Sequence, residues 1–183
     1  LSAGEGYGAS TLGQGQLVNV EYVSANPTGP LHLGHARGAV RGDVMAALLA
    51  KVGFDVTREY YINDAGAQVD VLGRTAYARY REVLGETITL EEGQYPGEYM
   101  IDIARAIAER DGDKWMSADE ADWLPEFRAF AIDYNMTQVR RTLADMDIDQ
   151  LFISERSIVE TGGVERAIEK LTDLGLMYWG VLE

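Results

Sequence analysis

The order of apolar and polar residues predicts a strand, a helix and a second strand in the first third of the chain. Residues 17–23 (LVNVEYV) are almost continuously apolar, as in a buried parallel strand. Apolar residues then recur at the spacing of an amphipathic helix up to about Lys51: Leu33, Ala36, Val40, Val44, Ala47 and Leu48. Residues 56–62 (VTREYYI) form the next predicted strand. Short connections between these elements predict an α/β fold built on a right-handed βαβ unit.

The rest of the chain is predominantly helical. A second helix is predicted over about 64–84, and the acidic segment 85–150 contains two further helices separated at Asp111-Gly112-Asp113. We interpret 85–150 as a helical insertion between elements of one sheet. Residues 151–183 are predicted to return to the sheet through 151–154, continue in a helix carrying Val164 to Leu174, and begin a truncated strand at 177–182. The glycine-rich residues 1–16 are expected to be a flexible lead-in to a catalytic domain that starts with 17–84.

Composition narrows the classes of partner. The 183 residues carry 30 acidic and 16 basic side chains, a formal charge of −14. This balance argues against an extended nucleic-acid surface and suits a small cationic substrate, although solubility alone explains much of it. No cysteine is present, which excludes disulfides and thiolate metal sites and fits a cytoplasmic protein. We expect no membrane partner, since no apolar run has the length of a membrane span.

Both histidines of the chain, His32 and His35, lie in the first turn of the first predicted helix. Unpaired backbone N–H groups and the helix dipole favour an anion there, and Gly34 allows close approach to the backbone. The turn follows a parallel strand, where α/β sheets bind ligands. These features predict a nucleotide-phosphate site, with the imidazoles stabilising charge on phosphate. The alternatives are a zinc site completed by carboxylates and two incidental polar residues at a helix start; we expect no metal site.

The stretch HLGH resembles the HIGH motif of class I aminoacyl-tRNA synthetases, and the longer segment Val18 to Gln68 resembles the arginyl-tRNA synthetase family. The resemblance is carried by VNVEYVSANPTGPLHLGHARGAVRGD and VTREYYINDAGAQVD, and extends to YPGEYMIDIA and DQLFISE. It implies the N-terminal part of a Rossmann-like class I catalytic fold, with a parallel sheet and a helical insertion. It also implies activation of L-arginine with ATP and Mg²⁺ to arginyl-adenylate, followed by transfer to tRNA(Arg).

Site residues follow from the resemblance position by position. It implies that Glu21 meets the arginine guanidinium, that Ser24, Asn26 and His35 hold the amino-acid head group, and that His32, Gly34 and His35 bind ATP. The two histidines are the implied catalytic residues. The family often has Pro at the position of Ala25 and Gly at that of Asn63, while Asp64 and Gln68 match in type without an assigned role. Without the resemblance, Glu21 is a candidate to pair with Arg58, and Arg37 and Arg41 are interpreted as a solvated face.

Two segments imitate functional motifs. Lys114-Trp115-Met116-Ser117 resembles the KMSK loop of class I synthetases, but it lies in the predicted insertion and lacks a second lysine. We expect the true lysine loop beyond Glu183, and therefore expect the chain to be an inactive fragment of the catalytic core when isolated. Ile153-Ser154-Glu155-Arg156-Ser157 resembles the Ser/Thr–Arg motif of small-molecule nucleotidyltransferases of the HxGH type, which is the alternative function. A non-catalytic binding module is the third.

Overall fold

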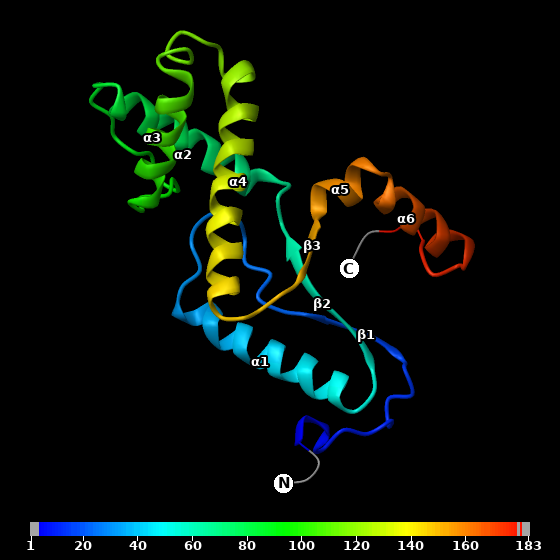
Figure 1. Ribbon diagram of the computed structural model, residues 1–183. Helices are drawn as coiled ribbons and strands as arrows, with labels where there is room; N and C mark the ends of the chain where they lie inside the picture. Colours follow the sequence, from blue (N-terminus) through cyan, green and yellow to red (C-terminus); the bar gives the residue numbers. More distant parts are fainter. Residues whose placement is uncertain (1–3, 179, 181–183) are drawn as a thin grey trace.

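A three-stranded parallel sheet forms the centre of the protein in a computed structural model that describes residues 4–178 and 180 (Figure 1). The strands lie in the order β1 (Leu17–Glu21), β2 (Asp55–Ile62) and β3 (Leu151–Ser154). Helix α1 (Leu33–Lys51) connects the first two, with Glu21 of β1 in register with Glu59 of β2. The predicted βαβ unit and parallel sheet are therefore confirmed, and residues 151–154 do return to the sheet.

Helix α1 packs on the sheet through small residues rather than through the predicted apolar stripe. Ala39 and Ala46 are its buried residues, and a Cβ at Gly42 would overlap the ring of Tyr22. The large residues of the predicted stripe are at least half exposed: Leu33, Val40, Val44 and Leu48. Periodicity located the helix correctly and its packing face incorrectly, because close approach of a helix to a sheet here depends on small residues that carry little hydrophobic signal.

Strand β1 stops at Glu21, two residues earlier than predicted. Val23 and Ser24 have φ angles of 68° and 38°, in the left-handed region that β-branched and polar L-residues rarely adopt. Such strain persists only where the surroundings enforce it, and it is often found at functional sites. It turns the chain sharply at the carboxyl end of β1, where the predicted site residues begin.

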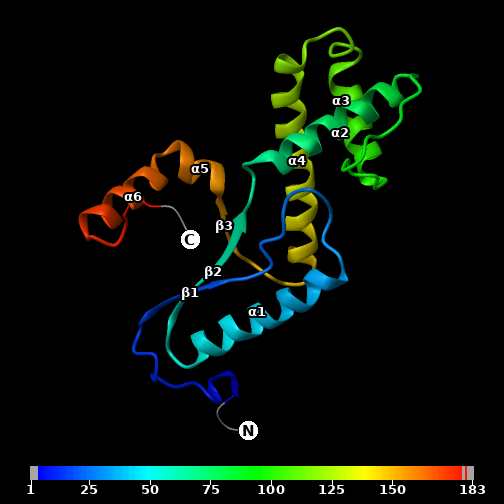
Figure 2. The same ribbon diagram turned by 180° about the vertical axis from the view of Figure 1, so that it is seen from behind.

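Helices α2 (Ala67–Val83), α3 (Tyr99–Asp111) and α4 (Glu120–Asp145) pack together at one end of the molecule, as the two opposite views show (Figures 1 and 2). The predicted break at Asp111-Gly112-Asp113 is where α3 ends. The three helices share one hydrophobic core that includes Leu72, Tyr80, Ile103, Ile107 and Phe127, each at most 1% exposed. The predicted insertion therefore packs directly on α2.

The two ends of the described chain extend from this body. After the short 3-10 helix Gly4–Gly6, residues 10–16 run beside 51–55, joined by hydrogen bonds such as Gly13 N–H to the Val52 carbonyl (2.8 Å). Helices α5 (Glu155–Glu160) and α6 (Gly163–Asp173) project on the other side of the sheet from α2 and α3 (Figure 2). Of the predicted strand 177–182, residues 177, 178 and 180 lie in no helix or strand, and 179, 181 and 182 are outside the described residues. None of the described helices is long and apolar enough to span a membrane.

Candidate active site at the carboxyl ends of β1 and β2

The loop after β1 is hydrogen-bonded to β2 at two positions, the predicted site residue Ser24 and its neighbour Ala25. Ser24 Oγ accepts a hydrogen bond from the Tyr61 backbone N–H at 3.0 Å. The Ala25 carbonyl accepts one from the Tyr60 hydroxyl at 2.9 Å, and Tyr60 is fully buried. Because the Ser24 oxygen is engaged as an acceptor, its own O–H remains to be donated to a ligand. This serine is thus positioned to offer one hydrogen bond at the strand edge.

Two further carbonyls of the same loop, those of Pro27 and Thr28, accept hydrogen bonds from the helices of the predicted insertion. Asn135 of α4, only 1% exposed, donates its Nδ2–H to the Pro27 carbonyl at 2.9 Å. The Tyr99 hydroxyl at the start of α3 donates to the Thr28 carbonyl at 2.6 Å. The insertion therefore supports the loop directly. Sequence analysis missed Tyr60, Asn135 and Tyr99; the available signal was that a buried tyrosine or asparagine needs a hydrogen-bond partner.

The side chain of Asn26 lies between two other amides. Its Nδ2–H donates to Gln68 Oε1 at 3.0 Å, and its Oδ1 accepts from Asn63 Nδ2 at 3.2 Å. Asn63 directly follows β2, and Gln68 is in the first turn of α2. Gln68 matches the motif of the family without an assigned role. In the structure it is a direct hydrogen-bond partner of Asn26, a predicted arginine-binding residue.

The two histidines form the amino-terminal cap of α1. His32 is the N-cap residue, and its Nδ1 accepts from the Gly34 backbone N–H at 3.1 Å. In return, His35 Nδ1 accepts from the His32 backbone N–H at 3.2 Å, and the rings stack with centroids 3.8 Å apart. This is the reciprocal arrangement of a capping box, made here by two imidazoles.

In the structure this cap already uses three of the backbone N–H groups at the helix start. The N–H groups of Gly34, His35 and Ala36 are all hydrogen-bonded to His32, through its Nδ1 or its carbonyl. Each imidazole also has a second ring nitrogen that the cap does not use. In a neutral imidazole whose Nδ1 is an acceptor, the hydrogen lies on Nε2, so each ring has one N–H that the cap leaves unused. Burial, followed by the charge of His32, lowers the pKa of His35, which favours this neutral form.

Gly34 serves the cap itself. A Cβ at this position would stand 2.9 Å from Cε1 and 3.0 Å from Nδ1 of His32, closer than side chains tolerate. The absence of a side chain therefore lets the His32 ring fold back over the helix start. Sequence analysis assigned that space to a ligand, whereas in the structure the ring of His32 lies beside it.

Carboxylates gather where the three strands end. Glu21 is exposed at the end of β1, and Glu155 follows β3 directly with its Oε2 buried and without a hydrogen-bond partner. Both influence Tyr61 of β2: burial is the largest cause that raises the pKa of its hydroxyl, followed by the negative charges of Glu155, Asp64 and Glu21. A buried carboxylate oxygen without a partner favours a cation. Sequence analysis did not select Glu155.

Arg58 does not pair with Glu21. It forms its ion pair with Asp43 of α1 (Nε to Oδ1, 3.3 Å), and the Tyr22 hydroxyl donates to the same Asp43 oxygen at 3.2 Å. The alternative structural role considered for Glu21 is therefore wrong. Arg37 and Arg41 are exposed on α1, as expected.

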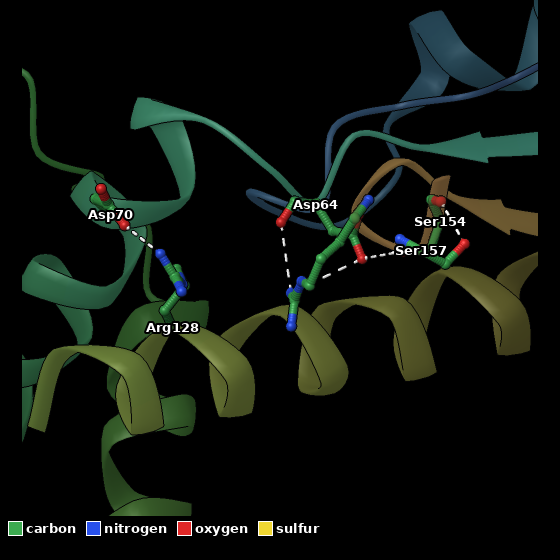
Figure 3. A network of polar contacts seen from close by, with 6 residues as sticks. Asp64, Asp70, Arg128, Ser154 and Ser157 are labelled. Atoms are coloured by element: carbon green, nitrogen blue, oxygen red, sulfur yellow. Dashed lines mark hydrogen bonds and ion pairs between the residues drawn. The ribbon is translucent and has the colours of Figure 1, made fainter. Parts of the chain in front are cut away.

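Asp64 has a clear structural role at the junction of β2, β3 and α5. Its carboxylate accepts from the Ser154 hydroxyl at 2.7 Å and from the Arg156 backbone N–H at 3.0 Å, and Ser154 also caps α5 (Figure 3). In the same view, Arg128 of α4 pairs with Asp70 of α2 at 2.8 Å. The serine and arginine that resemble a nucleotidyltransferase motif are thus used inside the chain to attach α5 to β2.

Lys114 lies far from the histidine turn. It sits between α3 and α4 with its Nζ 3.9 Å from the centre of the Trp115 ring. Helix α4 begins at Glu120 and reaches the loop after β1 at Asn135, a rise of about 22 Å along the helix axis. The segment around Lys114 therefore does not share the site with His32 and His35.

A family model described as the catalytic domain of class I tRNA synthetases (R) matches residues 1–178. Among curated proteins, the arginine–tRNA ligase of Ruegeria sp. (strain TM1040) is 54% identical over the whole chain, which corresponds to 32% of that protein. The arginine–tRNA ligase of Jannaschia sp. (strain CCS1) is 52% identical with the same coverage. The chain thus spans about a third of the length of the curated relatives it matches.

A solved structure gives the same picture at the level of the fold. The structure of a Campylobacter jejuni protein assigned as an arginyl-tRNA synthetase superposes with a TM-score of 0.83 at 32% identity. The match covers 98% of this chain and 39% of that one. The family model and this superposition both include the sheet, the histidine turn and helices α2 to α4.

Proposed function

Because the chain belongs to the family of class I tRNA synthetase (R) catalytic domains, we propose that the protein containing it is an arginine–tRNA ligase. The observation that carries this proposal is the meeting of an anion-binding histidine turn with an acidic strand edge. ATP is anionic and arginine is cationic, and both kinds of partner are present: the histidines at the start of α1, and the carboxylates of Glu21 at the end of β1 and Glu155 after β3.

The reaction begins with attack by the arginine carboxylate on the α-phosphorus of ATP. A phosphorus–oxygen bond forms to the carboxylate, the bond to the β-phosphate oxygen breaks, and pyrophosphate leaves. Negative charge grows on the α-phosphate oxygens during this exchange. The Nε2–H groups of His32 and His35, which the cap leaves unused, would stabilise that charge. In the second step a hydroxyl at the tRNA 3′ end attacks the acyl carbon, and AMP leaves.

Arginine would bind with its side chain toward Glu21 and Glu155 and its head group at the loop. A carboxylate can accept two parallel N–H bonds from a guanidinium, and Glu155 has a buried oxygen without a partner. The Ser24 hydroxyl and the Asn26 amide would meet the α-carboxylate and α-ammonium groups, with His35 beside them. The main contribution of such a site is to orient both substrates at one strand edge, because correct placement before the reaction removes a large part of the entropic barrier.

Mg²⁺ would enter the site on the ATP phosphates. Mg²⁺ prefers phosphates and waters and needs only one or two carboxylates from the protein. Within residues 4–178, no group of three His, Asp or Glu side chains is arranged to hold a metal ion. tRNA(Arg) is the proposed macromolecular partner, and the cytoplasm, where protein synthesis occurs, is the proposed location.

ATP–pyrophosphate exchange on the full-length protein that contains these residues tests the proposal. The expected result is exchange that depends on L-arginine, measured with tRNA(Arg) present, together with formation of arginyl-tRNA. Lysine and citrulline are the matched control substrates, since the first lacks the planar fork and the second lacks the charge. Exchange that ignores arginine but responds to phosphopantetheine or nicotinate mononucleotide would instead establish the nucleotidyltransferase alternative.

A further inference from the structure

The carboxamide of Asn26 is fixed at both ends by residues to which no function has been assigned. It donates to Gln68 at 3.0 Å and accepts from Asn63 at 3.2 Å, so the three amides form one continuous chain of hydrogen bonds. Asn63 directly follows β2 and Gln68 is in the first turn of α2, so the chain of amides joins the loop to both elements.

The chemistry of an amide makes this arrangement directional. A primary amide has two N–H donors and two lone pairs on its oxygen. In the observed direction Asn26 uses one N–H toward Gln68 and one lone pair toward Asn63. One N–H and one lone pair remain. Reversing the amide of Asn26 alone would set donor against donor at Asn63 and acceptor against acceptor at Gln68.

The remaining donor and acceptor match an α-amino acid head group, which presents a carboxylate and an ammonium group. We propose that Asn63 and Gln68 are positioning residues that hold the Asn26 amide with its free N–H toward the carboxylate and its free lone pair toward the ammonium of arginine. This inference rests on the proposed function and deepens it. The proposed role depends on the direction of the hydrogen bonds, from Asn63 to Asn26 and from Asn26 to Gln68, and polar side chains alone would not provide it.

Two variants that each add one negative charge separate direction from packing. Gln68→Glu keeps an acceptor facing Asn26 Nδ2 and preserves the direction. Asn63→Asp replaces a donor with an acceptor facing Asn26 Oδ1 and opposes it. In the full-length protein, Asn63→Asp should raise the arginine KM roughly three- to tenfold, the scale for losing one hydrogen bond, with the ATP KM unchanged. Gln68→Glu should stay within about twofold of wild type. Gln138→Glu, on an exposed position of α4, controls for added charge.

The outcomes are distinct. A selective rise in the arginine KM for Asn63→Asp with near-normal Gln68→Glu supports the inference. Equal effects of the two variants on the arginine KM, including no effect of either, overturn it. Parallel increases in the arginine and ATP KM values with a lowered melting temperature also overturn it, since they indicate a packing role. Failure of the proposed function is recognised separately, because the wild-type protein would then show no arginine-dependent exchange, and the inference would be refuted with it.

Discussion

The two halves of the candidate site are stabilised in opposite ways. The loop from Ser24 to Thr28 is held at every residue by other parts of the chain: β2, α2, α3 and α4 all donate to it or accept from it. The turn from His32 to His35 is held by hydrogen bonds within itself, and His32 and Gly34 are exposed. One half is anchored to the protein body, and the other caps its own helix.

This difference suits the two proposed substrates. Holding the head group of arginine in one orientation requires fixed donors and acceptors, and a loop anchored by four elements loses little entropy when it binds. The phosphates of ATP present the same charge in many orientations, so under the proposed function two imidazole N–H groups at a helix start would serve them without being anchored to the protein body. Substitutions in the anchored loop should therefore affect arginine binding and stability together, whereas substitutions in the histidine turn should affect the chemical step.

The largest expected effect is on the histidine turn. His32→Ala or His35→Ala in the full-length protein should each lower kcat for adenylate formation by roughly 10²–10³, the scale for removing one donor to a developing charge. His32→Asn is the matched control for structure, because asparagine is also a good N-cap residue and should preserve the helix start. Pre-steady-state adenylate formation and a thermal melt check both parts. Normal kcat in His32→Asn would show that the cap, and not the imidazole, is what the reaction requires.

Glu21 carries the second largest effect. Glu21→Gln removes a charged partner of the guanidinium, which should weaken arginine binding by about 1.5–3 kcal/mol. The arginine KM should rise accordingly while the ATP KM stays constant. Asp55→Asn, an exposed carboxylate at the opposite end of the neighbouring strand, should change neither value. Similar increases for both substrates in Glu21→Gln would contradict a specific contact with arginine.

Substitutions that remove a support of the anchored loop should lower stability and weaken arginine binding together. Asn135→Ala leaves the Pro27 carbonyl without its donor in a buried place, which should lower the free energy of unfolding by about 1–3 kcal/mol. We expect the arginine KM to rise in the same variant. Asn19→Ala, an exposed strand residue that bonds Glu59, provides the control. Thermal unfolding and exchange kinetics together test it; full stability with altered kcat alone would contradict the anchoring role.

Much of this fold could be predicted from sequence, because periodicity reports local structure. The βαβ unit, the break at Asp111 and the helix after residue 162 were all predictable from apolar spacing and from glycine positions. The packing face of α1 could not be predicted, because the residues that form it are small and have little hydrophobic signal: Ala39 and Ala46 are buried, and Gly42 lies against Tyr22. Periodicity identifies large apolar residues and cannot determine which neighbour, if any, covers them.

The candidate site shows the same division. His32, Gly34 and His35 were selected by motif and do lie together, but their backbone N–H groups are used in the cap, a fact that depends on ring orientation. Tyr99 and Asn135 act on the loop across 71 and 108 positions of the chain. Contacts over such separations depend on tertiary packing, which spacing within one segment does not reveal. Glu155 lies in a segment that resembles a nucleotidyltransferase motif, so its sequence context does not indicate a role in arginine binding.

Tyr99→Phe should have a smaller effect on the anchored loop. It removes the hydroxyl that bonds the Thr28 carbonyl and keeps the ring, so stability should fall by about 0.5–1.5 kcal/mol. Tyr178→Phe, at a tyrosine that is 88% exposed, should leave the melting temperature unchanged. A differential thermal melt of the two variants is sufficient. Equal melting temperatures for Tyr99→Phe and wild type would show that the loop does not depend on this contact.

The smallest expected effect is the pH dependence of the histidine turn. Burial and the charge of His32 lower the pKa of His35 below its usual value of 6.5, so the folded state prefers the neutral ring. The stability that this preference contributes is fully present above about pH 6.5 and is lost as the pH falls through the lower, folded-state pKa. Protonation places a hydrogen on Nδ1 of His35, which can then no longer accept from the His32 backbone N–H. The cap should therefore loosen on the acid side of neutrality.

Nitrogen-15 NMR of the imidazoles tests this expectation. His35 should show an Nε2–H tautomer and a titration midpoint below 6.5. The variant His35→Gln should keep the cap without this titration, because glutamine is a common third residue of a capping box. An Nδ1–H tautomer, or a midpoint above 6.5, would mean that the two rings do not cap the helix, and the distinction between a self-supported turn and an anchored loop would then have to be abandoned.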